Sequence, residues 1–371
     1  MKIIINLYIY LSRFLYMFFK VLPVRNKVVM ISRQADFVNL DFKLLGKELE
    51  EKYKVVYLCK MLKSGIKAKL RDKISYGFHT LRQMYHLSTS RVCILDSYCP
   101  TVSILHHKKK LTVIQMWHSI GTMKKFGYSI LDTEEGSRRM LAKLMHMHEN
   151  YDLIFAASSA YSSHLAAGFN CEKEKIVIKT LPRVDLLLSK KYEQEIREKI
   201  LKEYPSLKQK KNILYCPTFR KNEKNFRKAV QKLIDNIDYS KYNLIIKLHP
   251  LSKTKVTDKR VLFDTKFSTF EMLFIADLVV SDYSCIIYEA GLKNIPIYFY
   301  SFDIDDYQTK RGLMIDYKEL PGYKEKKASE LVKTFEKKYD YKYLREFTDK
   351  YVTNKKNCTR KIAKVVSNYM K

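Results

Sequence analysis

Short apolar runs alternate with amphipathic helical patterns along most of the chain. In the first half, five runs are almost continuously apolar and rich in β-branched residues: 27–32, 53–59, 91–97, 111–117 and 151–158. Runs of this kind are typical of parallel strands buried on both faces, because neither face of such a strand meets water. Helical patterns over 40–52 and 159–167 lie between them. The first half therefore predicts an open α/β domain.

The alternation resumes after a highly charged stretch over 190–211, which predicts one exposed helix. Helices are expected in STFEMLFIA and SCIIYEAGL, and the tail from about 329 onward is helical and charged. Five further apolar runs predict parallel strands: 212–219, 242–250, 261–264, 276–284 and 295–300.

The expected architecture is two doubly wound domains that face a cleft, with the carboxyl ends of the strands toward it. The predicted parts of the chain are a helix over 1–23, an N-terminal acceptor-side domain over 24–189, a charged connector over 190–211, a C-terminal donor-binding domain over 212–328 and a helical tail over 329–371.

The first 23 residues are apolar except on one side of a helix. At about 100° per residue, Lys2, Asn6, Arg13 and Lys20 fall within a wedge of roughly 40°. An amphipathic helix of this kind is suited to lie in the headgroup plane of an anionic leaflet, and Pro23 ends it. A transmembrane helix and a core helix are the alternatives; polar residues near its middle count against the first. A signal peptide fits poorly, because no small-x-small cleavage site follows.

The net charge of +31 is the strongest feature of the composition. A chain of 371 residues with 46% hydrophobic residues is large enough for two domains with sizeable cores. Such a positive field attracts nucleic acid, anionic membranes or phosphate-rich substrates, although lysine-rich faces are also simply solvated. Nucleic-acid binding remains an alternative, but no RNA-recognition fingerprint, helix-turn-helix signature or zinc module accompanies the charge.

The seven cysteines are scattered singly, with neither a CxxC pair nor metal-ligand spacing. An odd and dispersed set of this kind predicts free thiols in a reducing compartment. No metal site is therefore expected from the cysteines.

Polar side chains gather where one predicted strand of the second half ends. This strand ends at Ser281-Asp282, and Ser284 is expected at the N-cap of the next helix. A serine there, beside the free N–H groups of a helix start, binds phosphate well. Glu289 follows five residues later and is placed to accept hydrogen bonds from a ribose. An ordinary N-cap and an exposed helical acid are the alternatives for these two residues.

Two more predicted strands end in residues that suit a phosphate. CPTFR contains Thr218 and Arg220, and KLHP contains His249. Because the carboxyl ends of parallel strands meet at one edge of a sheet, these residues are expected near Ser284. The three strand ends together predict a site for a phosphorylated ligand.

Six segments, in this order, resemble the CDP-glycerol glycerophosphotransferase family of teichoic-acid synthesis: QMWHSIGTMKKFGY, LPRVD, YCPTFR, IIKLHP, ADLVVSDYS and FDIDDYQTKRGLMIDY. The resemblance covers roughly residues 24–340. It implies a GT-B-like fold and transfer of a polyol phosphate from CDP-glycerol or CDP-ribitol, without metal or cofactor. The implied acceptor is a hydroxyl of a lipid-linked saccharide or growing polymer.

The same resemblance implies work at the cytoplasmic face of the plasma membrane, where the N-terminal helix predicts peripheral attachment. No nucleic-acid partner is expected, because the motifs of such proteins are missing. A nucleotide-sugar glycosyltransferase on the same fold is the alternative within the enzymes. Some polymerases carry a large amino-terminal extension that this chain does not show, and its length therefore favours a primase or a short-chain enzyme.

The resemblance also assigns roles to individual residues. His118 matches the histidine of the Trp-His-Gly motif, taken as the general base, where a packed core histidine is the alternative. His249 and Ser284 match residues that contact the donor pyrophosphate. The other donor-site positions are Thr218, Arg220, Asp282, Glu289 and Arg311. Arg183 matches the arginine of a Pro-Arg-x-Asp segment with no assigned role.

Two departures from the family pattern are visible. The glycine that usually follows the histidine is displaced to Gly121, where it is expected to permit a close backbone turn, while Trp117 is expected to pack at the strand end. Cys285 stands in place of the second serine of Asp-Tyr-Ser-Ser. Asp-x-Asp at 303–305 is a weak metal–nucleotide signal and is incidental beside the family motifs.

Overall fold

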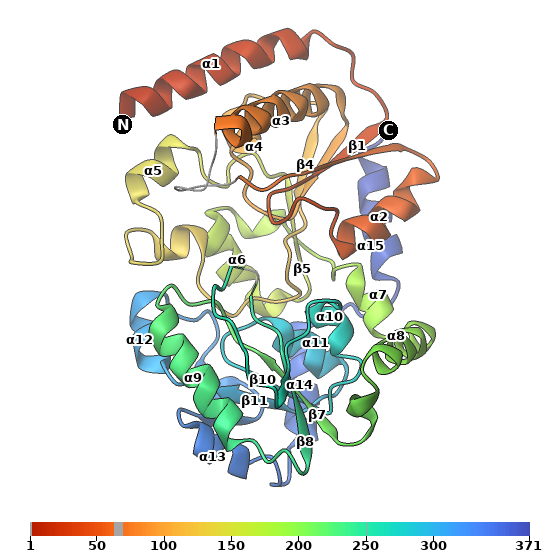
Figure 1. Ribbon diagram of the computed structural model, residues 1–371. Coiled ribbons are helices and arrows are strands. Elements are labelled where there is room, and N and C mark those ends of the chain that lie inside the picture. Colours follow the sequence, from red (N-terminus) through yellow and green to blue (C-terminus); the bar gives the residue numbers. More distant parts are fainter. Residues whose placement is uncertain (1, 63–69, 250) are drawn as a thin grey trace. The chain divides into compact units, whose positions relative to one another are not determined.

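The computed structural model describes residues 2–62, 70–249 and 251–371 (Figure 1). The chain forms two compact units. Unit 1 contains 1–119, 126–185 and 354–371, and unit 2 contains 120–125 and 186–353. These bounds differ from the expected domains at two places. The segment 120–125 packs with unit 2, and the end of the chain returns to unit 1 because helix α15 (Cys358–Asn368) packs on helix α2 (Leu40–Glu50).

Unit 1 is built on a parallel sheet whose strand order is β2-β1-β3-β4-β5-β6 within the described residues. Its strands are β1 (Lys27–Ser32), β2 (Lys54–Cys59), β3 (Val92–Leu95), β4 (Thr112–Gln115), β5 (Leu153–Ala156) and β6 (Ile176–Ile178). The first five confirm the apolar runs, and β1 and β3 are buried along their whole length. β6 is an edge strand that the sequence reading did not include.

The helices of unit 1 comprise α2, α15 and six more. These are α1 (Lys2–Lys20), α3 (Leu70–Thr89), α4 (Pro100–Ile104), α5 (Arg139–Leu144), α6 (Ser162–Phe169) and, at the end of the unit, α7 (Arg183–Leu187). Helix α3 was not anticipated. Its buried side includes His79, Gln83, Ser88 and Thr89, so its pattern does not separate apolar from polar residues in the usual way.

Unit 2 has a second parallel sheet, with the order β12-β11-β10-β7-β8-β9. Its strands are β7 (Lys211–Cys216), β8 (Tyr242–Ile246), β9 (Val261–Leu262), β10 (Leu278–Ser281), β11 (Ile297–Tyr300) and β12 (Tyr323–Glu325). Its helices are α8 (Lys190–Glu203), α9 (Glu223–Asn236), α10 (Thr269–Met272), α11 (Ile286–Leu292), α12 (Ile304–Lys310), α13 (Ala328–Lys333) and α14 (Tyr341–Tyr351).

The chain order reverses between β7 and β10 in the second sheet, which makes this pair its topological switch point. In open α/β sheets, ligands bind beyond the carboxyl ends of the strands at such a point. The prediction of two doubly wound α/β units with a GT-B-like fold and an N-terminal apolar helix is confirmed.

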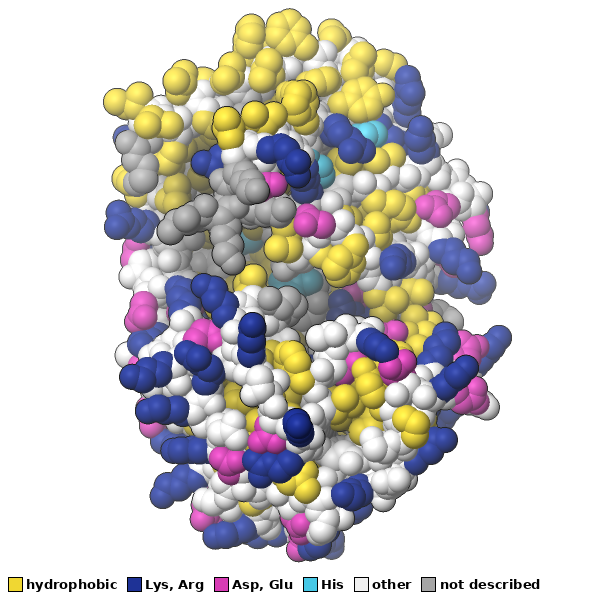
Figure 2. All heavy atoms as spheres, in the orientation of Figure 1, with side chains coloured by type: hydrophobic (Ala, Val, Ile, Leu, Met, Phe, Trp, Pro, Cys, Tyr) yellow, Lys and Arg dark blue, Asp and Glu magenta, His cyan; other side chains and the backbone are white. Residues whose placement is uncertain are grey.

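Helix α1 contacts the protein through Arg13, Ser12 and Tyr16, and its apolar side faces outward. Arg13 donates from Nε to the main-chain oxygen of Ile104 at 2.8 Å, and Ser12 and Tyr16 are buried. The outward side is apolar along its length (Figure 2), with Ile3, Ile4, Leu7, Tyr10, Leu11, Phe14, Met17 and Phe18 exposed. The helix is long and apolar enough to cross a membrane. Of the four residues of the predicted polar stripe, Arg13 binds unit 1, whereas Lys2 is exposed.

Candidate active-site residues in the two units

His118 lies just after β4, at the end of a turn that Trp117 makes with a left-handed backbone, φ 67°. A bulky residue adopts this conformation only where its surroundings hold it. The Trp117 N–H donates to Oε1 of Gln115 at 3.0 Å, and the indole packs on Phe126 and Phe169 with ring centroids 4.7 and 5.2 Å away. The expected packing of Trp117 at the strand end is thereby seen, and it directs the chain so that His118 is exposed.

The imidazole of His118 is oriented by the end of β3. Its Nδ1 lies 3.0 Å from the main-chain oxygen of Asp96. A carbonyl oxygen only accepts, so Nδ1 is the donor and carries the proton. In the neutral ring the other nitrogen, Nε2, then holds the lone pair. His118 therefore has the tautomer that a general base requires at Nε2.

Arg183 supports the same residue from α7. Its Nε donates to Oδ2 of Asp41 at 2.8 Å, its NH2 group also pairs with that carboxylate, and its main-chain N–H donates to Oδ1 at 2.8 Å. The NH2 group also donates to the main-chain oxygen of His118 at 3.2 Å. Asp41 is 1% exposed, so the carboxylate that binds Arg183 is buried. The arginine without an assigned role thus holds the backbone of His118.

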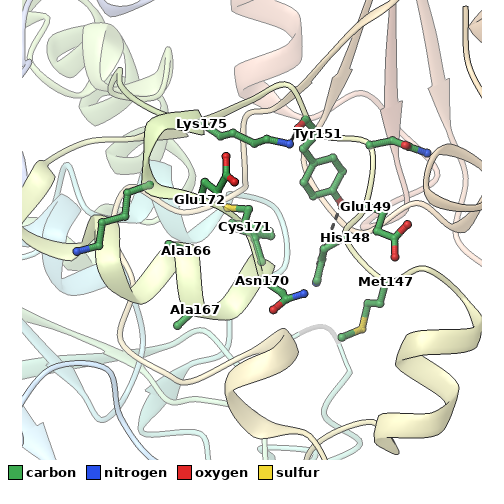
Figure 3. A pocket seen from close by; sticks show the side chains of 13 residues that line it. Met147, His148, Glu149, Tyr151, Ala166, Ala167, Asn170, Cys171, Glu172 and Lys175 are labelled. Carbon is green, nitrogen blue, oxygen red and sulfur yellow. Dashed lines mark hydrogen bonds between the residues drawn. The ribbon is translucent and has the colours of Figure 1, made fainter.

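A pocket of about 810 Å³ opens beside the aromatic cluster on which Trp117 packs (Figure 3). Phe169 and His148 belong to both, with ring centroids 5.0 Å apart, and Tyr151 lies against His148 with its hydroxyl 3.1 Å from Nδ1. Desolvation lowers the pKa of His148 to about 4, so this ring is neutral at pH 7. The pocket belongs to unit 1 alone.

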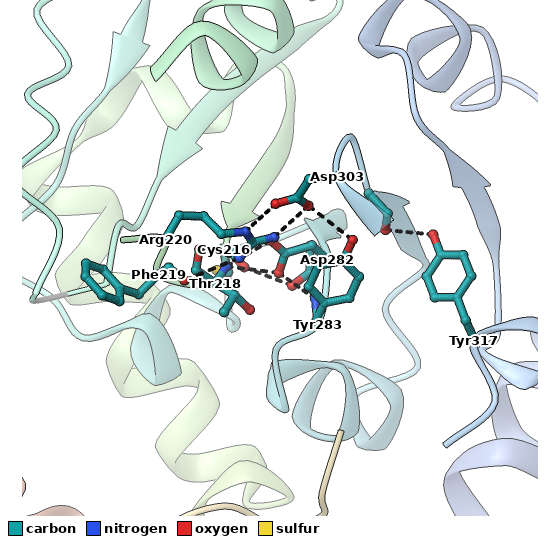
Figure 4. A network of polar contacts seen from close by, with 10 residues as sticks. Cys216, Thr218, Phe219, Arg220, Asp282, Tyr283, Asp303 and Tyr317 are labelled. Carbon is teal, nitrogen blue, oxygen red and sulfur yellow. Dashed lines mark hydrogen bonds and ion pairs between the residues drawn. The ribbon is translucent and has the colours of Figure 1, made fainter. Parts of the chain in front are cut away.

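In unit 2, Asp282 ties together the two strands of the switch point (Figure 4). Its carboxylate accepts the N–H of Thr218 at 2.9 and 3.1 Å and the N–H of Tyr283 at 2.5 Å. Thr218 is 7% exposed, and its hydroxyl has no hydrogen-bond partner among the residues that the structure describes. A buried hydroxyl of this kind is costly unless something else binds it.

Arg220 fills the space beside Asp282. Its guanidinium donates to Asp303 at 2.6 and 3.1 Å, to Asp282 at 2.9 Å and to the main-chain oxygens of Thr218 and Phe219 at 2.9 and 3.4 Å. Burial alone lowers its pKa, but the two carboxylates outweigh this and raise it. Each of the five N–H groups of the guanidinium therefore lies within hydrogen-bond distance of a protein acceptor, as expected for a residue that shapes the site.

The helix after β10 starts one residue later than the sequence suggested. The N-cap of α11 is Cys285, not Ser284, and its side chain makes no capping bond. Ser284 instead accepts the N–H of Ile286 at 3.4 Å, two residues on, a local bond that serine often makes in turns. Glu289 is 5% exposed, so the alternative of an exposed helical acid is wrong.

His249 follows β8 and has the opposite tautomer from His118. Its Nδ1 accepts the N–H of Leu251 at 3.2 Å, so Nε2 carries the proton in the neutral ring. Desolvation and then the charge of Lys124 lower its pKa, which favours this neutral form. Glu223 holds the following loop by accepting from Ser252 at 3.1 Å and from the Lys253 N–H at 2.8 Å.

The segment 120–125 docks on α11 and on the turn after α12. Gly121 faces the ring of Tyr288 so closely that an added Cβ would collide with it, and its carbonyl oxygen lies 3.6 Å from Sγ of Cys285. The Tyr288 hydroxyl donates to the main-chain oxygen of Thr122 at 2.8 Å, and the Met314 N–H donates to that of Met123 at 2.8 Å. The displaced glycine is thus required by close packing in unit 2.

This docking carries Lys124 to the residues of the switch point. Desolvation, with the positive charges of Arg311 and Arg220, lowers the pKa of Lys124 to about 8 against the opposing charges of Cys285 and Asp282. Arg311 donates from Nε to the main-chain oxygen of Lys125 at 3.2 Å. Two cations therefore lie near the end of β10, and the sequence reading connected only Arg311 with the donor.

The described residues contain no cluster of three or more His, Cys, Asp and Glu side chains arranged to hold a metal. The carboxylates of 303–305 have other partners, because Asp303 binds Arg220 and Asp305 pairs with Lys326 at 2.6 Å. All seven cysteines are free thiols, as their spacing predicted.

Comparison with known proteins identifies the family. The model of CDP-glycerol:poly(glycerophosphate) glycerophosphotransferases matches residues 14–368. The chain belongs to this family. It is a glycerophosphotransferase-like enzyme, as the sequence motifs predicted.

Curated relatives of this glycerophosphotransferase-like enzyme include two primases. The teichoic acid ribitol-phosphate primase of Bacillus spizizenii is 28% identical over 365 residues, which cover 94% of this chain and 93% of the primase. The teichoic acid glycerol-phosphate primase of Bacillus subtilis is 26% identical over 281 residues, covering 74% and 72%. Both polyols are thus represented among the relatives.

Solved structures support the fold. The wall teichoic acid polymerase TagF superposes with a TM-score of 0.75 at 18% identity, over 98% of this chain and 95% of that chain. At this identity the likeness shows the GT-B-like fold alone.

Asp41 and Asp96 were not singled out from the sequence, and Asp303 was noticed only as part of a weak Asp-x-Asp signal. Asp41, Asp96 and Asp303 act through partners 142, 22 and 83 positions away along the chain, so no local motif contains both members of a pair. The only signal for Asp96 was its place in the predicted buried strand 91–97, and Asp41 lies in the predicted helix 40–52.

Proposed function

We propose that this enzyme transfers glycerol phosphate or ribitol phosphate from its CDP-activated form to a hydroxyl of a lipid-linked saccharide or polymer in teichoic-acid synthesis. Family membership supports the class of reaction. The observation that carries the proposal is the switch point of unit 2, where the buried Thr218 hydroxyl, Lys124, Arg311 and His249 surround a site with phosphate-binding chemistry.

The chemistry assigns complementary tasks to the two histidines. His118 accepts the proton of the acceptor hydroxyl at Nε2 as its oxygen attacks the β-phosphorus of the donor. The bond between this phosphorus and the bridging oxygen breaks, and CMP leaves. His249 donates from Nε2–H to the donor phosphates, and this hydrogen bond strengthens as negative charge develops on the leaving CMP.

The cations and hydroxyls of unit 2 stabilise the same charge. Lys124 and Arg311 neutralise the donor diphosphate, with the hydroxyls of Ser284 and Thr218 as further donors. Asp282 and Arg220 act as positioning residues, because their polar atoms bind protein groups. The residues present supply the positive charge that a metal otherwise supplies to a diphosphate, so we propose a metal-independent reaction. Glu289 stays assigned to the ribose.

Helix α1 supports attachment to the cytoplasmic face of the membrane. Arg13 of its polar stripe is bound to unit 1, and its apolar side is exposed over its length. An exposed apolar surface of this size is typical of membrane or partner contact. We therefore propose that α1 lies in the membrane plane with its apolar side in the acyl region.

The function is tested by measuring CMP release from CDP-glycerol and CDP-ribitol with a lipid-linked disaccharide acceptor, in buffer with and without EDTA. We expect CMP release from one of the two donors, with EDTA having no effect. Thermal shifts with the same donors and with UDP-sugars provide the control. Stabilisation by UDP-sugars alone, with no CMP release, would contradict the proposal and favour a nucleotide-sugar glycosyltransferase.

A further inference from the structure

A second apolar row lies on α3, the helix against which α1 packs (Figure 1). Leu70, Ile74, Phe78 and Leu81 recur at helical spacing and are 73%, 53%, 65% and 37% exposed. Phe19 of α1 meets Tyr85 of α3 with ring centroids 6.4 Å apart. The apolar side of α1 and this row on α3 therefore belong to neighbouring helices of unit 1.

A pocket of about 290 Å³ lies between the end of β2 and α3. Phe78 lines it, so the pocket borders the apolar row. Two cationic residues, Lys60 and Arg82, also line it, and none of its lining residues is acidic. We call it the α3 pocket. Its volume suits a small phosphorylated group better than a nucleotide.

Polar hydrogen-bonding groups line the α3 pocket as well. Lys60 donates from Nζ to the Ser75 hydroxyl at 2.5 Å, which holds both side chains at the wall. His79 is 6% exposed, and its Nε2 has no hydrogen-bond partner among the residues that the structure describes. A buried nitrogen without a partner points to a ligand that completes its bonding. Asp36 is the carboxylate whose charge raises the pKa of His79. Its Oδ1 accepts the Met61 N–H at 2.8 Å.

His79 is uncharged at neutral pH. Desolvation, together with the charges of Lys60 and Arg82, lowers its pKa to about 4 against the weaker effect of Asp36. A neutral imidazole carries its proton on either ring nitrogen, and in the Nε2–H tautomer His79 would donate one hydrogen bond to an anion without adding charge to the surface. A neutral hydrogen-bond donor beside two cations is the property of a specific phosphate site, because a general attraction to an anionic bilayer needs only the cations.

We propose that the α3 pocket binds the phosphate of an anionic phospholipid headgroup, through Lys60, His79 and Arg82, while the apolar rows of α1 and α3 enter the bilayer. The inference rests on the proposed membrane attachment and adds a specific lipid contact to it. Charge complementarity supports this occupant, since the pocket offers two cations and a neutral donor where the apolar row ends.

The test measures binding of the full chain to vesicles of phosphatidylglycerol and of phosphatidylcholine. Replacing His79 by Phe removes the Nε2 donor and leaves the charge unchanged at pH 7.5. We expect it to weaken binding to phosphatidylglycerol about tenfold, with binding to phosphatidylcholine unchanged. Two further variants each remove one positive charge from α3. Arg82→Gln removes it from the pocket, and Lys73→Gln removes it from a position on the same helix outside the pocket. We expect the larger loss for Arg82→Gln.

A competition experiment distinguishes a lipid headgroup from free phosphate as the ligand of the pocket. Soluble glycerophosphoglycerol should displace the protein from phosphatidylglycerol vesicles, whereas inorganic phosphate at the same ionic strength should displace it less. His79→Gln, which retains an N–H donor, should restore binding and guards against a fold defect in His79→Phe. Equal displacement by both solutes would overturn the headgroup assignment.

The outcomes distinguish this inference from the proposed function. Unchanged phosphatidylglycerol binding by His79→Phe, or equal losses for Arg82→Gln and Lys73→Gln, would overturn the α3 pocket and leave membrane attachment standing. Absence of vesicle binding by the unaltered chain would overturn both. CMP release from the donor with a soluble acceptor analogue reports on the transferase separately, and we expect it to be the same for all of these variants.

Discussion

The main-chain oxygen of Asp96 accepts the Nδ1–H of His118 at 3.0 Å, and this one bond determines which nitrogen of the ring is basic. Asp96 follows β3 and His118 follows β4, and the two strands are adjacent in the sheet of unit 1. The proposed base is thus oriented by the backbone of a neighbouring strand.

Replacing His118 by Ala should lower turnover by about 10²- to 10⁴-fold, because the acceptor hydroxyl loses the group that removes its proton. CMP release from the CDP-polyol measures this. Since the side chain is exposed, the melting temperature should change little. Turnover equal to that of the unaltered enzyme would exclude His118 as the base.

Replacing Arg183 by Lys should lower kcat about tenfold or more with little change in KM for the donor. A lysine keeps the charge but cannot bind Asp41 bidentately and the His118 carbonyl at once. Steady-state kinetics with a pH profile measures the split between kcat and KM. A loss of melting temperature at unchanged kcat would mean that Arg183 serves only the stability of unit 1.

Replacing Gly121 by Ala should destabilise unit 2 by about 1–3 kcal/mol, because the new methyl group collides with the buried ring of Tyr288. Gly77 is the matched control. It lies within α3 with no atom within 4 Å of an added Cβ, so Gly77→Ala should stabilise by about 1 kcal/mol. Denaturant unfolding measures both. Similar effects for the two substitutions would contradict the close packing inferred for the displaced glycine.

Donor binding should weaken as the pH rises above about 8 because Lys124 loses its proton there. Its pKa is lowered to about 8, so the side chain is charged below that pH and neutral above it, and only the charged form attracts the diphosphate. We expect Lys124→Gln to raise KM for the donor about tenfold and to abolish this part of the pH dependence. Lys125→Gln, at the exposed neighbouring position, should do neither. An unaltered pH profile in Lys124→Gln would contradict the assignment.

Charged substitutions on the outer side of α1 should release the protein from membranes. Leu11→Glu and Phe14→Glu each remove an exposed apolar side chain, and vesicle binding should fall by about 10- to 100-fold for each. Phe37→Glu is the control, since Phe37 is 70% exposed and lies outside α1 and α3. Cosedimentation with vesicles measures the difference. Equal behaviour of the three variants would argue against α1 as the membrane contact.

The strands were predictable because their signal is local. Near-continuous apolar runs located β1, β7 and β10, since a parallel strand buried on both faces needs apolar residues at every position. The motifs around His118, His249 and Ser284 were likewise short segments at strand ends. They led to the family, which the match over residues 14–368 shows.

Partners far apart in the chain were decided only by the tertiary structure. Asp282 and Arg220 were predicted as donor contacts from the sequence, and the structure shows in addition that they bind each other across 62 positions. The packing of Gly121 against Tyr288 and the position of Lys124 near Asp282 depend on the segment 120–125, which belongs to unit 2 although the chain on both sides of it belongs to unit 1. The stripe on α1 shows the same limit. Its helical period was predictable from the sequence, because a periodic pattern separates the two faces of a helix. The pattern does not say what each face touches. In the structure, Arg13 donates to the carbonyl of Ile104, and this contact shows which side meets the protein.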